Sequence, residues 1–458
     1  MFSEEEELFK SHRALRYPVT MSGSYGFTSD PPTPPDSNEF EAEEAGSTGP
    51  SYLLALPPEL LLRIMSLADV SDLISLSQVN RTLFGLITTD TIWKRHCAPH
   101  TSPAPYSSFF DMYTHLLHRE GWLQGVWIGD RQFYGSLLVG RYNPFTGRVE
   151  LYEVRATRAS GSTGDESQFL VWDAVEDQVD DTDLVSHFHP HLGLRPAPLL
   201  VRHGHMPPIA DQTPPWTMIA TEAHAVRVYP LNDDAVAGLP ERQVWPSSHI
   251  PAVDRTLTMM SRNASIRHPG IGEEPFISKD LFKFFRGEDR STLNYITIGM
   301  LRVVVNGRDV YESFGRLHPE LMRRTKEKPL QGLWVGDYSA HGPEYLLLNY
   351  EVMENNTVLH AVKITGDPNV PRGEITFRVP DIVNPVRTKT SEDGTTRKYY
   401  PAWGQIAGYG FTSSEWTEAE FVWMSDEEIV LRWFLFDRAS TFRRVELDDL
   451  HLPAMMAQ

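Results

Sequence analysis

A short polar turn in the C-terminal half of the chain carries residue types suited to binding chemistry. Residues 366–369 read GDPN and follow the run KIT at 363–365. Asp side chains accept hydrogen bonds from nearby backbone N–H groups and proline presets its dihedral angle, so GDPN is typical of a turn. At the mouth of a β-barrel such a turn exposes N–H groups, Asp367 and Asn369, which suit the capture of a peptide end. The alternative is a hairpin connection that binds no ligand.

Histidines gather in the central part of the chain, and imidazole is a common zinc ligand. They are His187, His189, His191, His203 and His205, with Asp211 close by in the sequence. A zinc site built from these residues is one reading. Because no cysteines accompany them, we interpret the histidines as solvent-exposed side chains and expect no metal and no cofactor.

The common catalytic motifs are absent from the sequence. It contains no GxxxxGK[ST], no GxGxxG after a strand, no HExxH and no GxSxG. Carboxylate pairs carry no information in a chain with 61 acidic residues, since a solvated face is their default role. We therefore expect a protein without catalytic residues.

Composition limits the classes of partner. The chain has 458 residues, 41% of them apolar and 11% aromatic, which is ample for two or three domains with a core. A net charge of −19 argues against nucleic acid and against an anionic membrane surface. The best apolar run, residues 429–436, is interrupted by Arg432 and shorter than the ~20 residues that span a bilayer.

The terminus and the cysteine count indicate a compartment. The N-terminus is acidic rather than basic and then apolar, which predicts no signal peptide. Cys97 is the only cysteine, so no intrachain disulfide can form, and this fits a reducing compartment. We expect the protein in the cytoplasm, the nucleus or both.

Residues 56–97 predict three short amphipathic helices. A helix from about Glu59 follows two prolines, which a first helical turn tolerates. Leu60, Ile64 and Leu67 recur at spacings of four and three and form an apolar stripe. Asp72 or Ser71 is expected to cap the second helix, and Asp90 the third. Helices this short cannot bury all their apolar surface among themselves, so a face is left for a partner.

This segment resembles an F-box, the adaptor-docking module of cullin-based ubiquitin ligases. The resemblance rests on the order and spacing of Leu56-Pro57, Ile64, Asp72-Leu73, Val79 and Trp93. It implies a Skp-type adaptor, and through it a cullin-RING ligase, as partners. The implied adaptor contacts are Leu56, Pro57, Leu60, Ile64, Leu73, Leu76 and Val79. Trp93 is expected to lock the third helix, and the alternative is a helical subdomain with all these residues in one core.

The lone thiol narrows what an F-box protein of this kind can do. Ligases that carry ubiquitin as a thioester need a nucleophilic cysteine, and RING-type ligases need several Cys and His zinc ligands. Neither set is present. We expect Cys97 to be a buried structural thiol, and the protein to position a substrate rather than modify it.

The pattern predicts an α+β protein with four parts. Residues 1–50, with ten acidic and three basic residues, form an acidic, proline-rich tail that we expect to be disordered. Residues 51–98 are the F-box, and residues 99–121 a connecting helix. From residue 122 to 452 the period-two alternation of strands predicts a large antiparallel β-barrel-like domain with an insertion at about 155–288. Short helices are expected around Lys279 to Phe285 and around His318 to Arg324.

The β region contains an internal echo. Residues 123–130 read LQGVWIGD and residues 330–337 read LQGLWVGD, each followed by a glycine, Gly135 or Gly342. Two copies about two hundred residues apart are too few for a solenoid or a propeller. We expect two equivalent strands in two halves of one sheet or barrel.

Three further segments complete a family resemblance: QGLWVGDYSAHG at 331–342, the residues around GDPN at 360–379, and AWGQIAGYGF at 402–411. Together with the F-box they resemble the F-box only protein 31 family of substrate receptors, most strongly from Pro329 to about Val445. The resemblance implies a β-barrel-like domain that binds a short substrate segment, such as a C-terminal end. The implied pocket residues are Trp334, Tyr338, His341, Lys363, Thr365, Asp367, Asn369, Trp403 and Tyr409.

Two hypotheses of different classes follow. The first is a substrate-recognition subunit of an SCF-type (Skp, cullin, F-box) ubiquitin ligase, which binds the adaptor and a protein substrate. The second is a β-barrel that binds a small apolar ligand, with the F-box used only for interaction or as a scaffold. The interior near Trp127 and Trp334 distinguishes them, because the second hypothesis needs it to be hollow.

Overall fold

A computed structural model provides the structure of the chain, and its described residues fall into several ranges. They are 52–131, 133–158, 190–195, 200–201, 225–226, 237, 239, 241–251, 254–258, 281–285, 311–338, 342–353, 356–390 and 394–452. The expected tail and most of the expected insertion lie outside them. The chain divides after Pro57, and before that point Leu56 donates its N–H to the Leu53 carbonyl, closing a turn.

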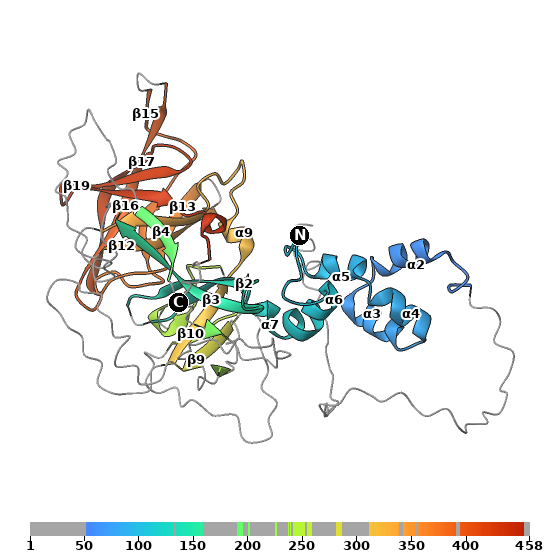
Figure 1. The fold of residues 1–458 in the computed structure, drawn as a ribbon. Coiled ribbons are helices and arrows are strands. Elements are labelled where there is room, and N and C mark those ends of the chain that lie inside the picture. The colour runs from blue at the N-terminus through green and yellow to red at the C-terminus, as the bar shows by residue number, and fades with distance from the viewer. Residues whose placement is uncertain are drawn as a thin grey trace, which may run out of the picture. The chain divides into compact units, whose positions relative to one another are not determined.

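Four short helices, rather than three, make up the F-box region (Figure 1). They are α2 (Pro58–Met65), α3 (Val70–Ser77), α4 (Arg81–Ile87) and α5 (Asp90–His96). The extra helix, α4, begins after Asn80, whose side chain accepts a hydrogen bond from the Leu83 N–H and so caps it.

The predicted caps of the other helices were wrong by one to three residues. Helix α3 begins after Asp69 rather than after Asp72 or Ser71, and α5 begins after Thr89. Asp90 instead accepts a hydrogen bond from the Phe109 N–H, so this carboxylate joins α5 to the next helix.

The connecting helix is present and contains a widened turn. It consists of α6 (Phe109–Met112), a π-helical segment (Tyr113–Leu117) and α7 (His118–Glu120). Ser108 caps it by accepting a hydrogen bond from the Asp111 N–H. Its buried side chains Phe109 and Met112 pack with α2–α5, and Leu116 packs with the strands that follow. None of the described helices is long and apolar enough to cross a membrane.

The rest of the described chain is antiparallel β structure in two large sheets. The first has the order β4-β3-β2-β1-β10-β9-β6, with β5 also paired to β3. Its strands are β1 (Gly125–Gly129), β2 (Ser136–Asn143), β3 (Arg148–Arg158), β4 (Pro190–Leu194), β5 (Leu200–Val201), β6 (Ala225–Val226), β9 (Leu281–Phe285) and β10 (Tyr311–Leu317). A small pair, β7 (Val244–Trp245) and β8 (Thr256–Leu257), stands apart.

The second sheet closes on itself. Its order is β14-β13-β12-β11-β19-β18-β17-β16-β15, and β14 also pairs with β16, which joins the two ends into a ring. The strands are β11 (Gly332–Asp337), β12 (Pro343–Val352), β13 (Thr357–Lys363), β14 (Ile375–Val379), β15 (Arg387–Thr390), β16 (Thr396–Gly408), β17 (Thr412–Trp423), β18 (Glu428–Trp433) and β19 (Arg438–Arg444). The chain therefore carries an N-terminal helical F-box region followed by a large antiparallel β-barrel, as predicted.

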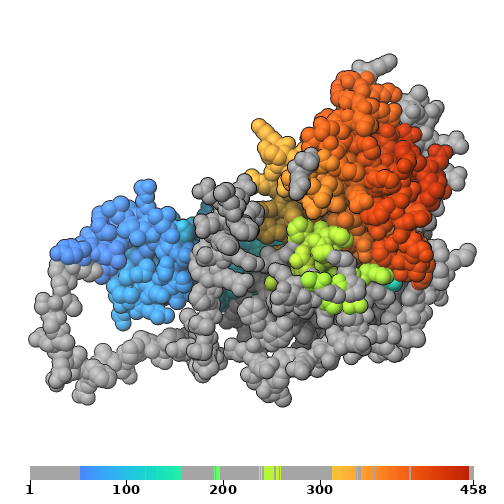
Figure 2. All heavy atoms as spheres, turned by 180° about the vertical axis from the view of Figure 1, so that it is seen from behind, coloured from blue at the N-terminus to red at the C-terminus, as the bar shows by residue number. Residues whose placement is uncertain are grey.

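Aromatic and branched side chains fill the ring. Every strand of the second sheet except β15 contributes inward-facing residues to one buried cluster, which includes Trp334, Phe377, Phe421 and Phe442. Alternate residues on β11, β12 and β13 face outward and pack against the first sheet. Figure 2 shows the atoms of these strands, in orange and red, as one continuous mass. The buried polar groups described below stand out against this apolar filling.

Two other expectations need correction. Of the piece around Lys279 to Phe285, the described residues Leu281–Phe285 form strand β9, not a helix, and pair with β10 in an antiparallel ladder. The piece around His318 to Arg324 is helical as expected, in α9 (Pro319–Met322). The two echo segments are equivalent strands, β1 and β11, but each lies in its own sheet rather than in two halves of one.

The echo extends to a shared side-chain arrangement, which we call the Trp–Arg clasp. In the ring, Trp334 donates from Nε1 to the Leu330 carbonyl at 2.9 Å, and the Arg444 guanidinium stacks over its ring at 4.6 Å. In the first sheet, Trp127 donates to the Leu123 carbonyl at 2.8 Å, and Arg316 stacks at 4.5 Å.

In each clasp the guanidinium also donates hydrogen bonds to backbone carbonyls just before or at the start of the tryptophan strand. Arg444 donates to the carbonyls of Gln331, Pro329 and Asp426 at 2.7–2.9 Å. Gly332 stands beside it with φ +133°, and a Cβ there would lie 3.0 Å from Nη1 of Arg444. A side chain is therefore excluded by both the backbone angle and the guanidinium.

Arg444→Ala is expected to lower the free energy of unfolding by about 3 kcal/mol, because three backbone acceptors and a cation–π contact are lost. Urea unfolding followed by tryptophan fluorescence measures the change. Arg438→Ala, at an exposed position of the same strand, is the control. Equal midpoints for Arg444→Ala and the wild type would show that the clasp does not stabilise the ring.

Candidate functional site

The F-box helices form a small core and leave apolar side chains outside it. Leu61, Met65 and Leu73 are buried in that core. Leu60 and Ile64 are 47% and 48% exposed, although both are large aliphatic residues on one face of α2. The further exposed apolar residues of these helices and their turns are Leu67, Ile74, Val79 and Phe84. Large apolar side chains gathered in this way are typical of a protein-binding surface.

The predicted adaptor residues divide between this surface and the core. Leu60, Ile64 and Val79 are exposed, and so is Pro57, while Leu56 is half-buried. Leu73 does not belong to the surface, because its side chain is 0% exposed. Leu76 is half-buried against the same core.

The predicted roles of Trp93 and Cys97 agree with the structure. Trp93 is buried and donates from Nε1 to the Ile87 carbonyl, which ties α5 to the end of α4. The Cys97 thiol is buried and lies 3.3 Å from the Phe109 carbonyl. Burial, reinforced by Asp90, raises the pKa of Cys97 to about 11. The thiol is therefore a poor nucleophile at neutral pH.

At one end of the ring, a lysine is buried between two carboxylates. Lys363 ends β13, and its side chain is 1% exposed. Its Nζ lies 2.6 Å from Asp367 Oδ2 and 2.6 Å from Glu344 Oε2. The ammonium also sits 4.5 Å over the ring of Tyr338, whose hydroxyl lies 2.9 Å from Thr376 Oγ1. We call Lys363, Glu344, Asp367 and Tyr338 the buried lysine cluster.

One of the two carboxyl groups in the cluster, that of Glu344, favours its neutral, protonated form. Burial raises the pKa of Glu344 well above its usual range; Lys363 opposes this shift and Asp367 adds to it. Burial acts to lower the pKa of Lys363, but Asp367 and Glu344 outweigh burial and raise it. We infer a charged Lys363 paired with the Asp367 carboxylate beside a protonated Glu344.

The GDPN turn is buried, not exposed as its sequence suggests. Asp367 is 3% exposed, and its Oδ1 accepts from the N–H groups of Asn369 and Val370 at 2.6 and 3.0 Å. The Gly366 N–H donates to the Tyr134 carbonyl, which belongs to the first sheet's β1–β2 turn. Because these N–H groups are already satisfied, they do not offer the free donors that capture of a peptide end requires.

Other predicted pocket residues serve the turn and the core. Thr365 Oγ1 accepts from the Tyr345 N–H at 2.8 Å, and Asn369 Nδ2 donates to the Ala407 carbonyl at 2.8 Å. Trp334 is fully buried in its clasp, so its ring is not available at a surface.

The remaining pocket residues spread apart. Trp403 is 36% exposed and lies on the outer face of the ring beside Arg378. Tyr409 is 64% exposed at the tip of the β16–β17 hairpin. His341 lies outside the described residues. The structure thus brings together Tyr338, Lys363 and Asp367, and leaves Trp403 facing elsewhere.

Tyr409 nevertheless belongs to the same end of the ring as the buried lysine cluster. In an antiparallel ring, alternate connections lie at one end. The connections after β11, β13, β16 and β18 share an end, and the N–H of Gly410 donates to the Pro368 carbonyl there. The β18–β19 turn adds three consecutive apolar residues, Phe434, Leu435 and Phe436, exposed by 52–59%. We call this end the lysine end.

Sequence reasoning missed Glu344 and the β18–β19 turn. Alternation along β12 places Glu344 on the same face as Leu346 and Leu348, so a charged residue inside the ring was readable from the pattern. The run FLF at 434–436 extends the apolar stretch of β18 past the strand end, where alternation stops.

The hypothesis of a small apolar ligand depends on a hollow interior. Around Trp334 the interior holds a packed cluster of buried aromatic and aliphatic side chains. Trp127 is likewise fully buried, against Leu138, Leu151 and Phe314. This packing disfavours the hypothesis. Among the described residues no group of three His, Cys, Asp or Glu side chains could hold a metal ion; His187, His189, His203, His205 and Asp211 lie outside them.

Comparison with known proteins follows the same division of the chain. The F-box-like family model matches residues 53–99, and the Cyclin D1 binding domain model matches residues 314–449, which include the whole ring. The chain thus carries an F-box-like region and is similar to proteins named F-box only protein 31.

Individual relatives support this resemblance to different extents. F-box only protein 31-A of Xenopus laevis is 25% identical over 370 residues, covering 77% of this chain and 59% of the relative. F-box only protein 31 of Homo sapiens is 35% identical over 128 residues, 24% of each chain. Protein EXECUTER 2, chloroplastic, of Arabidopsis thaliana is 30% identical over 129 residues, 24% of this chain and 19% of the relative. The chain thus covers less than two thirds of the Xenopus laevis relative.

Glu344→Gln is expected to make stability less dependent on pH. An unfolded Glu ionises near pH ~4.3, whereas folded Glu344 keeps its proton to a higher pH. Wild-type stability gained from this group is present below pH ~4.3 and is lost as pH rises towards the folded pKa, by at most ~1.4 kcal/mol per pH unit. The variant lacks this loss.

Urea midpoints between pH 5 and pH 8 test the expectation. The stability of Glu344→Gln relative to the wild type should increase with pH, while the exposed control Glu415→Gln should follow the wild type. Parallel curves for all three proteins would mean that Glu344 is ionised in the folded state.

Proposed function

We propose that the chain is the substrate-recognition subunit of an SCF-type E3 ubiquitin ligase. In this proposal the F-box docks a Skp-type adaptor, and the β-barrel captures a segment of a protein substrate. The observation that carries it is the F-box-like match at 53–99 together with the apolar side chains left outside the helical core. The receptor itself does no bond chemistry.

The receptor would act through proximity. Holding a substrate near a separate ubiquitin-carrying enzyme raises the effective concentration of the target lysine. Such a role needs two binding surfaces at separate places on one chain. The exposed face of α2 and α3 is the first, and the lysine end of the ring is our candidate for the second.

The lysine end supports peptide capture through its exposed apolar residues. Tyr409, Phe434, Leu435 and Phe436 are large and more than half exposed, and such side chains anchor binding segments. The buried lysine cluster lies at the same end of the ring, where the Lys363 ammonium is paired with the Asp367 carboxylate. The family model's description suggests a substrate resembling cyclin D1. An extended segment with apolar side chains, such as a C-terminal end, fits these exposed residues.

Leu60→Asp with Ile64→Asp tests adaptor docking. Both side chains are about half exposed on α2, so burying aspartates there would be costly in the complex without emptying the F-box core. We expect at least a tenfold loss of affinity for a Skp-type adaptor, measured by surface plasmon resonance with the full chain. Val352→Asp, an apolar residue 76% exposed on β12, is the matched control. Retention of full affinity by the double variant would refute docking through this face.

Tyr409→Ala with Phe434→Ala tests capture at the lysine end. A library of peptides with free C-terminal ends, displayed on beads, is screened with the full chain for retained sequences. The double variant should retain the selected peptides at least tenfold less strongly. The control, Val352→Ala with Met353→Ala, removes exposed apolar groups from the opposite end, in the turn after β12. If the control loses binding instead, the substrate site lies elsewhere.

A further inference from the structure

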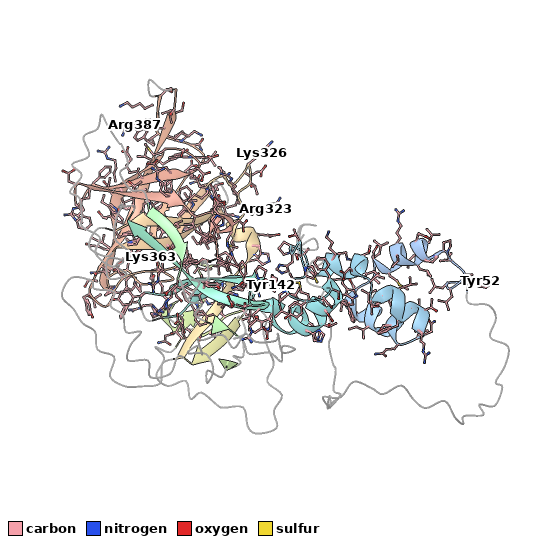
Figure 3. All side chains as sticks on the ribbon, viewed as in Figure 1. Tyr52, Tyr142, Arg323, Lys326, Lys363 and Arg387 are labelled. Carbon is pink, nitrogen blue, oxygen red and sulfur yellow. The ribbon has the colours of Figure 1, made fainter. Side chains whose placement is uncertain are left out.

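A basic hairpin projects from the ring at the end opposite the lysine end. Strand β15 pairs with the first residues of β16, from Arg387 opposite Tyr399 to Thr390 opposite Thr396. The other end of β16 turns at 409–411, beside Pro368. Figure 3 accordingly labels Arg387 at β15 and Lys363 far from it. All four residues of β15 are exposed.

Some cations of this hairpin contact aromatic or acidic side chains of the ring, and others do not. Arg387 stacks over Tyr399 at 3.9 Å and lies 3.0 Å from Glu420 Oε1. Lys398 lies over the ring of Trp423 at 4.5 Å. These two cations are held by partners within the ring.

Lys389 and Arg397 face each other directly across the two strands. Like charges at directly opposite positions destabilise a strand pair. Among the described residues no carboxylate is paired with either cation, and Arg397 Nε is buried without a hydrogen-bond partner. The turn residues Glu392 and Asp393 lie outside the described residues. In a chain of net charge −19, this hairpin thus brings together exposed Lys389 and half-buried Arg397, and neither pairs with a carboxylate of the described residues.

The backbone of β15 offers a second feature. Among the described strands β15 pairs only with β16, so one of its edges has N–H and C=O groups free for another strand. Charged side chains often protect such edges from aggregation. A single cation would be enough to protect the edge from aggregation. The second cation, directly opposite the first, adds electrostatic repulsion, and an anionic partner would relieve that repulsion.

We propose that β15 is a docking edge for an acidic, extended segment of a partner protein. The segment adds as a further strand beside Arg387–Thr390, and its carboxylates lie against Lys389 and Arg397. Backbone hydrogen bonds supply part of the affinity, and charge selects the sequence. This site lies apart from the lysine end and from the adaptor face, so it goes beyond the proposed function and would give the receptor a second grip on its partner.

Fluorescence anisotropy with the full chain tests this proposal. The probe is a fluorescein-labelled twelve-residue peptide of alternating glutamate and threonine. The wild type should bind it, and Lys389→Glu with Arg397→Glu should weaken binding at least tenfold. Because both residues lie on a hairpin outside the filled ring, the variant should keep the wild-type urea midpoint. Absence of wild-type binding overturns the proposal.

Two matched controls separate strand addition from simple charge attraction. Arg323→Glu with Lys326→Glu makes the same charge change at exposed cations near α9, which Figure 3 labels, and should bind within twofold of wild type. The same peptide with alternate backbone nitrogens methylated should bind at least tenfold more weakly. If the α9 variant loses as much affinity as the hairpin variant, or if the methylated peptide binds equally well, the docking edge is disproved. Equal binding of a single-stranded oligothymidine of similar charge would also disprove it.

Discussion

The ring depends on the pairing of its last strand, β19, with its first, β11, and the Trp–Arg clasp reinforces that pairing. Strands β11 and β19 are neighbours in the closed sheet, and Arg444 stands opposite Trp334 in their register. The guanidinium covers the indole from one strand and holds the carbonyls that precede the other. An up-and-down sheet has two free edges until such a contact is made. The interior cluster and the lysine end both require the closed form.

The closed interior explains how a lysine and two carboxylates come to be buried together. A single buried charge would be costly, but Lys363 meets Asp367 and Glu344 within ion-pair distance. The protonated state inferred for Glu344 avoids a second buried negative charge. The Lys363–Asp367 ion pair is therefore held at the end of the ring that also carries the exposed aromatic side chains. The F-box region, by contrast, has a core of apolar side chains, and it also leaves apolar residues exposed.

Much of the fold was predictable because alternation is a local property. The strands at 136–143, 357–363 and 428–433 follow directly from period-two patterns. The number of F-box helices was not, because the cap at Asn80 was overlooked; the extra helix contributes Leu83 and Ile87 to the core in which Leu73 is buried. For the site, Lys363, Asp367 and Tyr338 were predicted from family resemblance and do lie together. The burial of the GDPN turn was beyond local reasoning, since Gly366 bonds to Tyr134, more than two hundred residues earlier.

The second clasp, Trp127 with Arg316, repeats the arrangement of the first clasp in the other sheet. The two sheets repeat the same tryptophan, the same arginine and the same glycine with a positive φ angle, at Gly125 and Gly332. Each sheet therefore fixes the start of its tryptophan strand by the same combination of indole, guanidinium and glycine. The two sheets differ at one buried position. In the first sheet β2 begins with Ser136, which donates to Glu312. The corresponding position of β12 holds Glu344, which lies beside Lys363. One backbone arrangement thus accommodates either a hydroxyl or a carboxylate at this buried position, and the neighbouring strands supply its partner.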